Sequence, residues 1–83
     1  MNITTANALP QKLASGVSGV LGNLTGAEYG LLLYVGTQVV NGVNHLFIAR
    51  QTLTTLGGEQ HLVKLIIHEK DEKFALSSIE VIV

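Results

Sequence analysis

The sequence predicts an α+β domain in which one N-terminal helix packs on a four-stranded antiparallel sheet. Apolar residues recur at spacings of three and four over residues 9–24, which is typical of an amphipathic helix. From Tyr29 onward, shorter runs rich in Leu, Val and Ile are typical of strands. Asn41-Gly42 and Gly57-Gly58 mark reversals between these runs. We therefore expect the helix first and the antiparallel strands after it.

The length of 83 residues allows one domain with one hydrophobic core, which we place at residues 9–83. Residues 1–8 are small and mostly polar, and we expect them to form a flexible arm. Hydrophobic residues make up 47% of the chain and charged residues 13%, which is an apolar balance for so small a body. This balance favours self-association.

The predicted helix has an apolar face and three glycines near one stripe. Pro10 suits its first turn. Missing side chains at the glycines favour close packing of the helix on the sheet, and a membrane helix-pairing surface is the alternative. Polar residues interrupt the segment too often for a bilayer span of about 20 apolar residues. The apolar positions are Leu9, Leu13, Val17, Val20, Leu21 and Leu24, and the glycines are Gly16, Gly19 and Gly22.

The strongest hairpin signal is Asn41-Gly42, because a type I′ turn requires positive φ at both central residues. A two-residue loop there would place Val40 opposite Val43 and Gln38 opposite His45. Residues 61–69 form the expected third strand, residues 70–73 a charged turn and residues 74–83 the last strand. The expected faces of the first hairpin are Tyr34, Gln38, Val40, His45, Phe47 and Ala49 on one side, and Val35, Thr37, Val39, Leu46 and Ile48 on the other.

Both faces of this hairpin are substantially apolar, and one helix can cover only one of them. The other face is then a surface for a second protomer, in a homodimer or a hairpin-exchanged oligomer. The candidate dimer face consists of Val35, Leu46 and Ile48.

The sequence Gln38-Val39-Val40-Asn41-Gly42 has the form Q-x-V-x-G, with Asn44 beyond it and Tyr29-Gly30 at the start of the preceding strand. In this position, after one helix and one strand, the pattern resembles the cystatin superfamily, and the stefins more than the disulfide-bonded members. The resemblance covers roughly residues 11–69. It implies a reversible, non-covalent inhibitor that plugs the active-site cleft of papain-like cysteine proteases.

The resemblance assigns protease binding to Gln38, Val39, Val40, Asn41 and Gly42, with residues 1–8 as a second contact and residues 70–73 as a third. The chain departs from the inhibitory pattern at three places. The arm has no glycine, the second tip is Lys-Asp-Glu-Lys rather than apolar, and His45 stands where an aromatic Tyr is usual. A non-inhibitory domain that acts in self-association or protein binding is therefore the alternative function.

Other chemistry has little support in the sequence. Five Lys and Arg against six Asp and Glu, without a basic cluster, argue against nucleic-acid binding. The spacing of His61 and His68 points them to opposite faces of one strand, so we expect no metal site. We also expect no catalysis and no cofactor, because the carboxylates are scattered and no Gly-rich phosphate loop occurs. The first residues lack a secretory pattern, and no cysteine is present, so we expect a cytoplasmic protein without a membrane partner.

Overall fold

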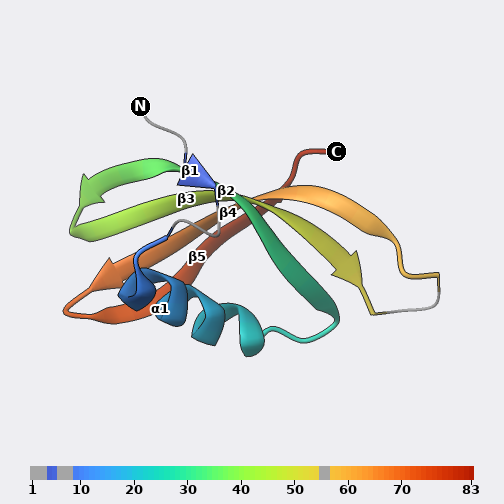
Figure 1. The fold of residues 1–83 in the computed structure, drawn as a ribbon, viewed down its shortest axis with the longest axis horizontal. Helices are drawn as coiled ribbons and strands as arrows, with labels where there is room; N and C mark the ends of the chain where they lie inside the picture. Colours follow the sequence, from blue (N-terminus) through green and yellow to red (C-terminus); the bar gives the residue numbers. More distant parts are fainter. Residues whose placement is uncertain (1–3, 6–8, 55–56) are drawn as a thin grey trace.

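The computed structural model describes residues 4–5, 9–54 and 57–83, and Figure 1 shows its elements. One helix and four long antiparallel strands confirm the predicted α+β arrangement. A two-residue strand before the helix, which the sequence analysis did not predict, adds a fifth strand at one edge. In chain order the elements are β1 (Thr4–Thr5), α1 (Gln11–Gly22), β2 (Ala27–Val40), β3 (Gly42–Leu53), β4 (Gln60–Lys70) and β5 (Lys73–Val81).

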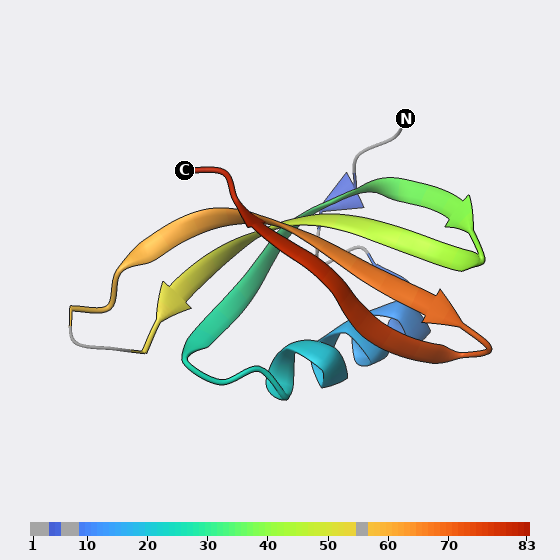
Figure 2. The same ribbon diagram turned by 180° about the vertical axis from the view of Figure 1, so that it is seen from behind.

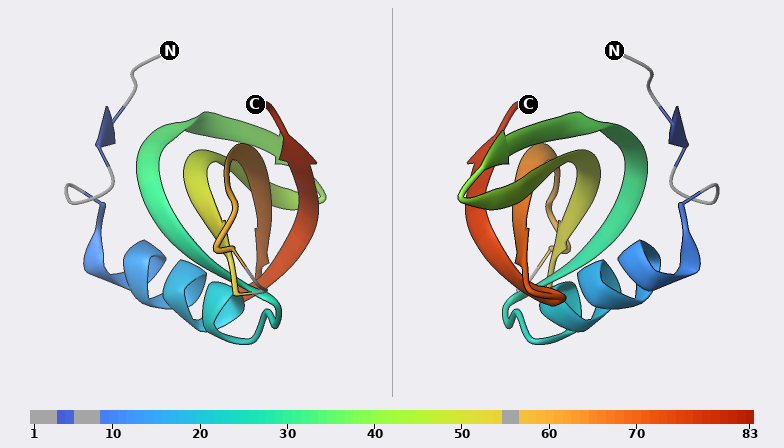
Figure 3. Two further views of the ribbon diagram at one scale, coloured as in Figure 1. Left: turned by 90° about the vertical axis from the view of Figure 1, so that its right-hand side faces the viewer. Right: turned by 90° about the vertical axis from the view of Figure 1, so that its left-hand side faces the viewer.

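The strands follow the order β1-β2-β3-β4-β5, and each pairs antiparallel with its neighbour. Figures 1 and 2 show α1 lying along one face of a twisted sheet, which is viewed along its length in Figure 3. The helix packs mainly against β5 and β2. The opposite face, which we call the open face, is left without a covering element among the described residues. In this part of the chain, no helix has both the length and the apolar character to cross a membrane.

The core lies between α1 and the middle strands. Alternate residues of β3 and β4 point toward the helix, as the pleat of a strand requires. Five of these residues, and Val17 of the helix, have no exposed surface. Burial of these apolar side chains is the main source of the protein's stability. The buried apolar residues are Leu13, Val17, Phe47, Ala49, Val63, Leu65 and Ile67.

The helix begins after Pro10, whose carbonyl oxygen accepts a hydrogen bond from the Ala14 backbone N–H at 2.9 Å. It is shorter at both ends than the predicted residues 9–24. Gly26 then turns the chain into β2 with a φ of 87°, a conformation that glycine adopts without strain. This turn sets the direction in which β2 crosses the helix.

Close packing of the helix glycines on the sheet is confirmed at one position only. A Cβ atom on Gly16 would lie 2.4 Å from the Phe74 ring, so the missing side chain lets the helix approach β5. Gly19 and Gly22 have no neighbouring atom within 4 Å of the same position. The prediction is wrong for these two glycines, because both lie on exposed parts of the helix surface and not against the sheet.

The predicted register of the first hairpin is wrong by one residue. Val40 pairs with Gly42 and Val39 with Val43, so Asn41 alone lies between the paired residues. The pairing is also irregular between Tyr34 and Gly36, where Val35 has no partner in β3. As a result, Gln38 and Val40 lie on the same face as Leu46, while Thr37 and Val39 lie on the face of His45. The faces predicted for Tyr34, His45, Phe47 and Ala49 agree with the structure.

Candidate functional site

Two hairpin tips and the first turn of α1 lie at the same end of the molecule. The first tip is residues 38–42, between β2 and β3, and the second tip is residues 70–73, between β4 and β5. Figures 1 and 2 both show these tips at one end of the sheet, with the start of the helix beside them. We call this end the tip end. The antiparallel topology places the two tips at the same end of the sheet, because the β2–β3 and β4–β5 turns both lie at that end of the strands.

The first tip presents apolar side chains to solvent. Val39 is 82% exposed and Val40 is 44% exposed, with Gln38 and Asn41 exposed on either side of them. Val39 contributes little to stability through burial, because most of its surface stays in water, and Val40 remains nearly half-exposed. Adjacent exposed valines at a protruding tip are a favourable surface for contact with a partner.

Gly42 has a structural role that the motif alone does not reveal. Its φ is 102°, and a Cβ atom at this position would lie 2.6 Å from the Glu69 carbonyl oxygen. The backbone of β3 therefore starts directly against β4, where the side chain of any other residue would collide. Gly42 fixes the position of the first tip relative to the base of the second.

A partly buried chain of hydrogen-bonded side chains supports the tips from the helix side. His45 is 7% exposed, with Tyr34 Oη at 2.7 Å from its Nδ1 and Glu69 Oε1 at 2.8 Å from its Nε2. A neutral imidazole satisfies both contacts when Nε2–H donates to the carboxylate and Nδ1 accepts from the tyrosine hydroxyl. We call this the Tyr34–His45–Glu69 chain. It joins β2, β3 and β4 within a few residues of both tips.

Aromatic rings pack around this chain. The Tyr34 ring stacks on Phe47 with centroids 5.0 Å apart, and the His45 ring stacks on Phe74 with centroids 6.3 Å apart. On the open face, His68 Nδ1 lies 2.8 Å from Asn44 Oδ1, which joins β3 to β4 a second time. The bases of the two tips are thus connected by side-chain hydrogen bonds on both faces of the sheet.

The second tip is charged and has an uncommon backbone. Asp71 and Glu72 have φ values of 53° and 64°, although neither is glycine. Glu72 forms an exposed ion pair with Lys12 of the first helical turn. This pairing raises the pKa of Lys12 and lowers the pKa of Glu72, through the hydrogen bond first and charge attraction second. The ion pair links the helix to the second tip, whose four residues are all charged.

The predicted arm, residues 1–8, lies almost wholly outside the described residues. Thr4 and Thr5 form β1 and pair with Tyr34 and Leu33 of β2. This places the described part of the arm beside the same strand that leads to the first tip.

The structure places two of the three predicted dimer-face residues together. Leu46 and Ile48 alternate with the buried His45, Phe47 and Ala49, so they lie on the open face. Val35 lies at the β-bulge and pairs with no residue of β3. Gly36, Leu46 and Ile66 contribute to a hollow of about 160 Å³ on this face, near the first tip.

The three histidines do not converge. His45 faces the helix, His68 faces the open side, and His61 lies 3.5 Å from Glu59 at the other end of β4. Within the described residues, no group of three or more His, Cys, Asp or Glu side chains is arranged to hold a metal ion.

Sequence reasoning identified the first tip but missed the Tyr34–His45–Glu69 chain. The only signal was the departure at His45, a polar residue at a position with the alternation of a core strand. Glu69 lies 24 residues away on another strand, and only the register of β3 and β4 brings the two together.

Comparison of the chain with protein-family models, with curated proteins and with solved structures gives no significant match.

Proposed function

We propose that this protein is a reversible, non-covalent inhibitor of papain-like cysteine proteases, and that the first tip enters the active-site cleft of the protease. The resemblance of Gln38-Val39-Val40-Asn41-Gly42 to the cystatin pattern motivates the proposal. The observation that carries it is the exposure of Val39 at 82% and Val40 at 44% at the end of a protruding hairpin.

Binding of this kind depends on removing apolar surface from water without ordering a flexible segment. Each Å² of apolar surface that becomes buried contributes roughly 25 cal/mol. The cost of ordering falls when the binding segment is already held in place. Gly42 and the Tyr34–His45–Glu69 chain support the proposal because they hold the first tip in one position against β4.

Replacing Val39 by aspartate is expected to weaken inhibition by about a hundredfold, because the carboxylate would lose its hydration on entering the cleft. The fold should persist, since the side chain is 82% exposed. The measurement is titration of an active papain-like protease with wild-type and V39D protein. Val83→Asp is the matched control, because Val83 is a 76% exposed valine at the far end of the chain.

Wild-type protein should inhibit stoichiometrically and release active protease on dilution, and V83D should behave like wild type. Failure of the wild-type protein to inhibit several papain-like proteases at micromolar concentration would refute the proposal. Equal inhibition by V39D and wild type would show that the protease contacts a part of the protein other than the first tip. The proposal includes a cytoplasmic location, which suits a chain that has no cysteine to oxidise.

A second candidate function, self-association without inhibition, is favoured by the open face. Leu46 and Ile48 lie there with Ile66 from the next strand, and the register places Lys64 directly opposite Ile48. Two such faces could pack together in a homodimer, since an uncovered apolar sheet face gains stability when a second sheet covers it.

Replacing Ile48 by glutamate is expected to convert a dimer into a monomer without unfolding it. In the monomer the new carboxylate stays in water beside Lys64, which already pairs with Glu80 at 3.1 Å, whereas a dimer interface would bury the added charge. Sedimentation equilibrium over a range of concentrations measures the change. Thr54→Glu, at an exposed position outside the strands, is the control for added charge. A wild-type protein that stays monomeric at high concentration would exclude this function.

A further inference from the structure

The first tip contains an asparagine in a position that favours the spontaneous loss of its side-chain amide. Asn41 is the single residue between the paired Val40 and Gly42, and it is exposed to solvent. It is also the only asparagine of the sequence that precedes a glycine. Because glycine has no side chain, the backbone nitrogen of Gly42 is open to approach by the asparagine side chain before it.

The loss of the amide requires the Gly42 nitrogen to reach Cγ of Asn41, which needs a rotation of the Asn41 backbone. Asn41 lies at the end of the β2–β3 ladder, where backbone hydrogen bonds open locally at a lower cost than in the middle of a strand. Its exposed side chain also leaves room for water to enter and for ammonia to depart. The reaction is therefore easier at the first tip than inside the sheet or the helix.

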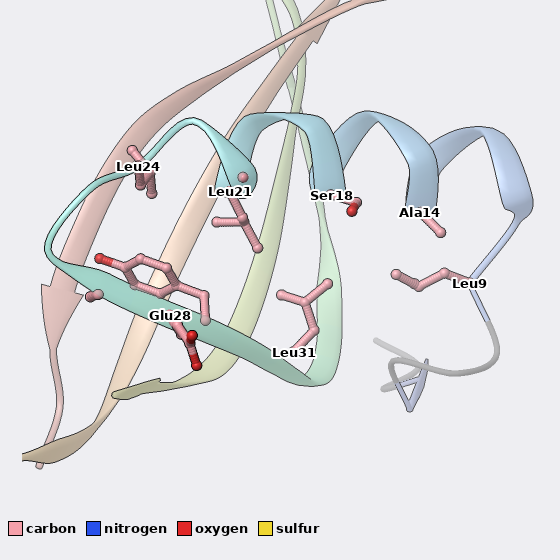
Figure 4. A pocket seen from close by; sticks show the side chains of 10 residues that line it. Leu9, Ala14, Ser18, Leu21, Leu24, Glu28 and Leu31 are labelled. Carbon is pink, nitrogen blue, oxygen red and sulfur yellow. The ribbon is translucent and has the colours of Figure 1, made fainter. Parts of the chain in front are cut away.

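The other described asparagines lack this combination. Asn23, at the end of α1, precedes Leu24, whose backbone N–H donates to a carbonyl oxygen of the last helical turn at 3.1 Å. Figure 4 shows Leu24 in the turn after the helix, where its side chain forms part of a groove wall. Asn44 lies inside β3, with its Oδ1 at 2.8 Å from Nδ1 of His68. Within the described part of the chain, we expect the reaction first at Asn41.

We propose that Asn41 is a site of spontaneous deamidation, and that this modification ends the binding of the first tip to a protease. The Gly42 nitrogen gives up its proton to water and attacks Cγ of Asn41, and the new C–N bond closes a succinimide ring. The side-chain nitrogen takes up a proton from water and leaves as ammonia. Water then opens the ring at either carbonyl carbon, which gives aspartate or isoaspartate. The second part of the proposal rests on the proposed function.

Either product changes the surface that would enter the cleft. Both place a carboxylate next to the exposed Val39 and Val40, and burying this charge would remove its hydration. Isoaspartate also adds a methylene group to the backbone between Val40 and Gly42, where a single residue makes the link. Because the Gly42 backbone lies directly against β4, the added length should distort the tip and not shift β3.

The test follows modification and inhibition in the same samples. Wild-type protein is kept at neutral pH and physiological temperature, and peptide mapping by mass spectrometry measures the modified fraction at each asparagine. Asn41 should be converted at least about tenfold faster than Asn23 or Asn44. The modified protein carries an added negative charge, so anion exchange separates it. It should inhibit a papain-like protease about a hundredfold more weakly than the unmodified protein.

Two variants separate this reaction from other changes during the incubation. Asn41→Gln has a longer side chain, which would have to close a larger and more slowly forming ring, so this protein should keep its own starting inhibition throughout. Asn23→Gln is the matched control, because it makes the same change at an exposed asparagine at the far end of α1. Asn23→Gln should lose inhibition at the wild-type rate.

Conversion of Asn41 no faster than that of Asn23 would overturn the site. Full inhibition by the purified modified protein would overturn its effect on binding, and so would an equal loss of inhibition in Asn41→Gln. If the wild-type protein fails to inhibit before the incubation, the proposed function is refuted, whereas deamidation of Asn41 is still decided by the mass measurement.

Discussion

Replacing Gly42 by alanine is expected to destabilise the protein by about 3 kcal/mol, because the change adds both backbone strain and a steric clash. The φ of 102° is one that residues with a side chain rarely adopt. The new Cβ would lie 2.6 Å from the Glu69 carbonyl oxygen and 2.9 Å from the His68 ring. Because the carbonyl belongs to the backbone of β4, it can move only if the two strands separate. Urea unfolding followed by circular dichroism measures the loss.

Gly19→Ala is the matched control for this prediction. The same substitution at Gly19 meets no atom within 4 Å and lies inside α1. It should stabilise the protein by up to about 1 kcal/mol, because alanine favours a helix over glycine. If Gly42→Ala destabilises the protein and Gly19→Ala stabilises it, the loss at Gly42 comes from its surroundings and not from the replacement of glycine by alanine as such. A G42A protein as stable as wild type would show that the strands can relax around the new methyl group.

This role of Gly42 changes which residues can test inhibition. A substitution at Gly42 would disturb the fold and the tip together, so a loss of inhibition could not be assigned to the contact itself. Val39 avoids this difficulty, because it is 82% exposed and its removal leaves no cavity. Folding thus accounts for the glycine of the motif, whereas it gives no reason for two exposed valines beside it.

The architecture could be predicted from the sequence because its signals are local. The apolar spacing predicted α1 to within two residues at each end, and Asn41-Gly42 located the first tip. The register could not be predicted in the same way. It depends on the bulge at Val35 and on the close approach of Gly42 to Glu69, and both are contacts between strands. A shift of one residue was enough to move Gln38 and Val40 to the other face.

In the candidate site, too, the local features could be predicted from the sequence and the contacts between strands could not. The residues of the first tip are consecutive, so a short pattern identified them. Their support is assembled from three strands, and no spacing along the chain links Tyr34, His45 and Glu69. The contact between Lys12 and Glu72, 60 residues apart, is likewise a product of the fold. Sequence reasoning therefore located the tip but not the interactions that position it.

Replacing His45 by leucine is expected to destabilise the protein by about 2 kcal/mol, although leucine suits a buried position. The loss arises because the substitution removes the partner of the Glu69 carboxylate and of the Tyr34 hydroxyl at once. Both tips should also become less ordered, so inhibition should weaken as well. Thermal unfolding and protease titration measure the two effects.

His61→Leu is the control for this variant. His61 also lies on a strand near a glutamate, but its side chain is 27% exposed and its contact with Glu59 is long, at 3.5 Å. This substitution should change stability by less than about 0.5 kcal/mol. A His45→Leu protein with wild-type stability and wild-type inhibition would show that the Tyr34–His45–Glu69 chain does not support the tips.

Because Tyr34 belongs to the Tyr34–His45–Glu69 chain, we expect the stability of the protein to fall in alkaline solution. Burial raises the pKa of Tyr34 above its usual 10.0, and the negative charge of Glu69 raises it further. Because the folded protein holds this proton more tightly than the unfolded chain, the contribution is complete below pH 10.0 and is lost as the pH rises through the folded pKa.

Tyr34→Phe should therefore flatten the decline of stability above pH 10.0, at the cost of a lower stability at neutral pH. Lys12 contributes in a similar window, because its pKa is raised above 10.5 by Glu72. Its ion pair is exposed, however, so Lys12→Met should change the decline much less than Tyr34→Phe. Unfolding curves of the three proteins between neutral and alkaline pH separate the contributions. If Lys12→Met flattened the decline and Tyr34→Phe did not, the alkaline sensitivity would come from the Lys12–Glu72 ion pair at the second tip. Ionisation of Tyr34 would then make no contribution to the loss of stability.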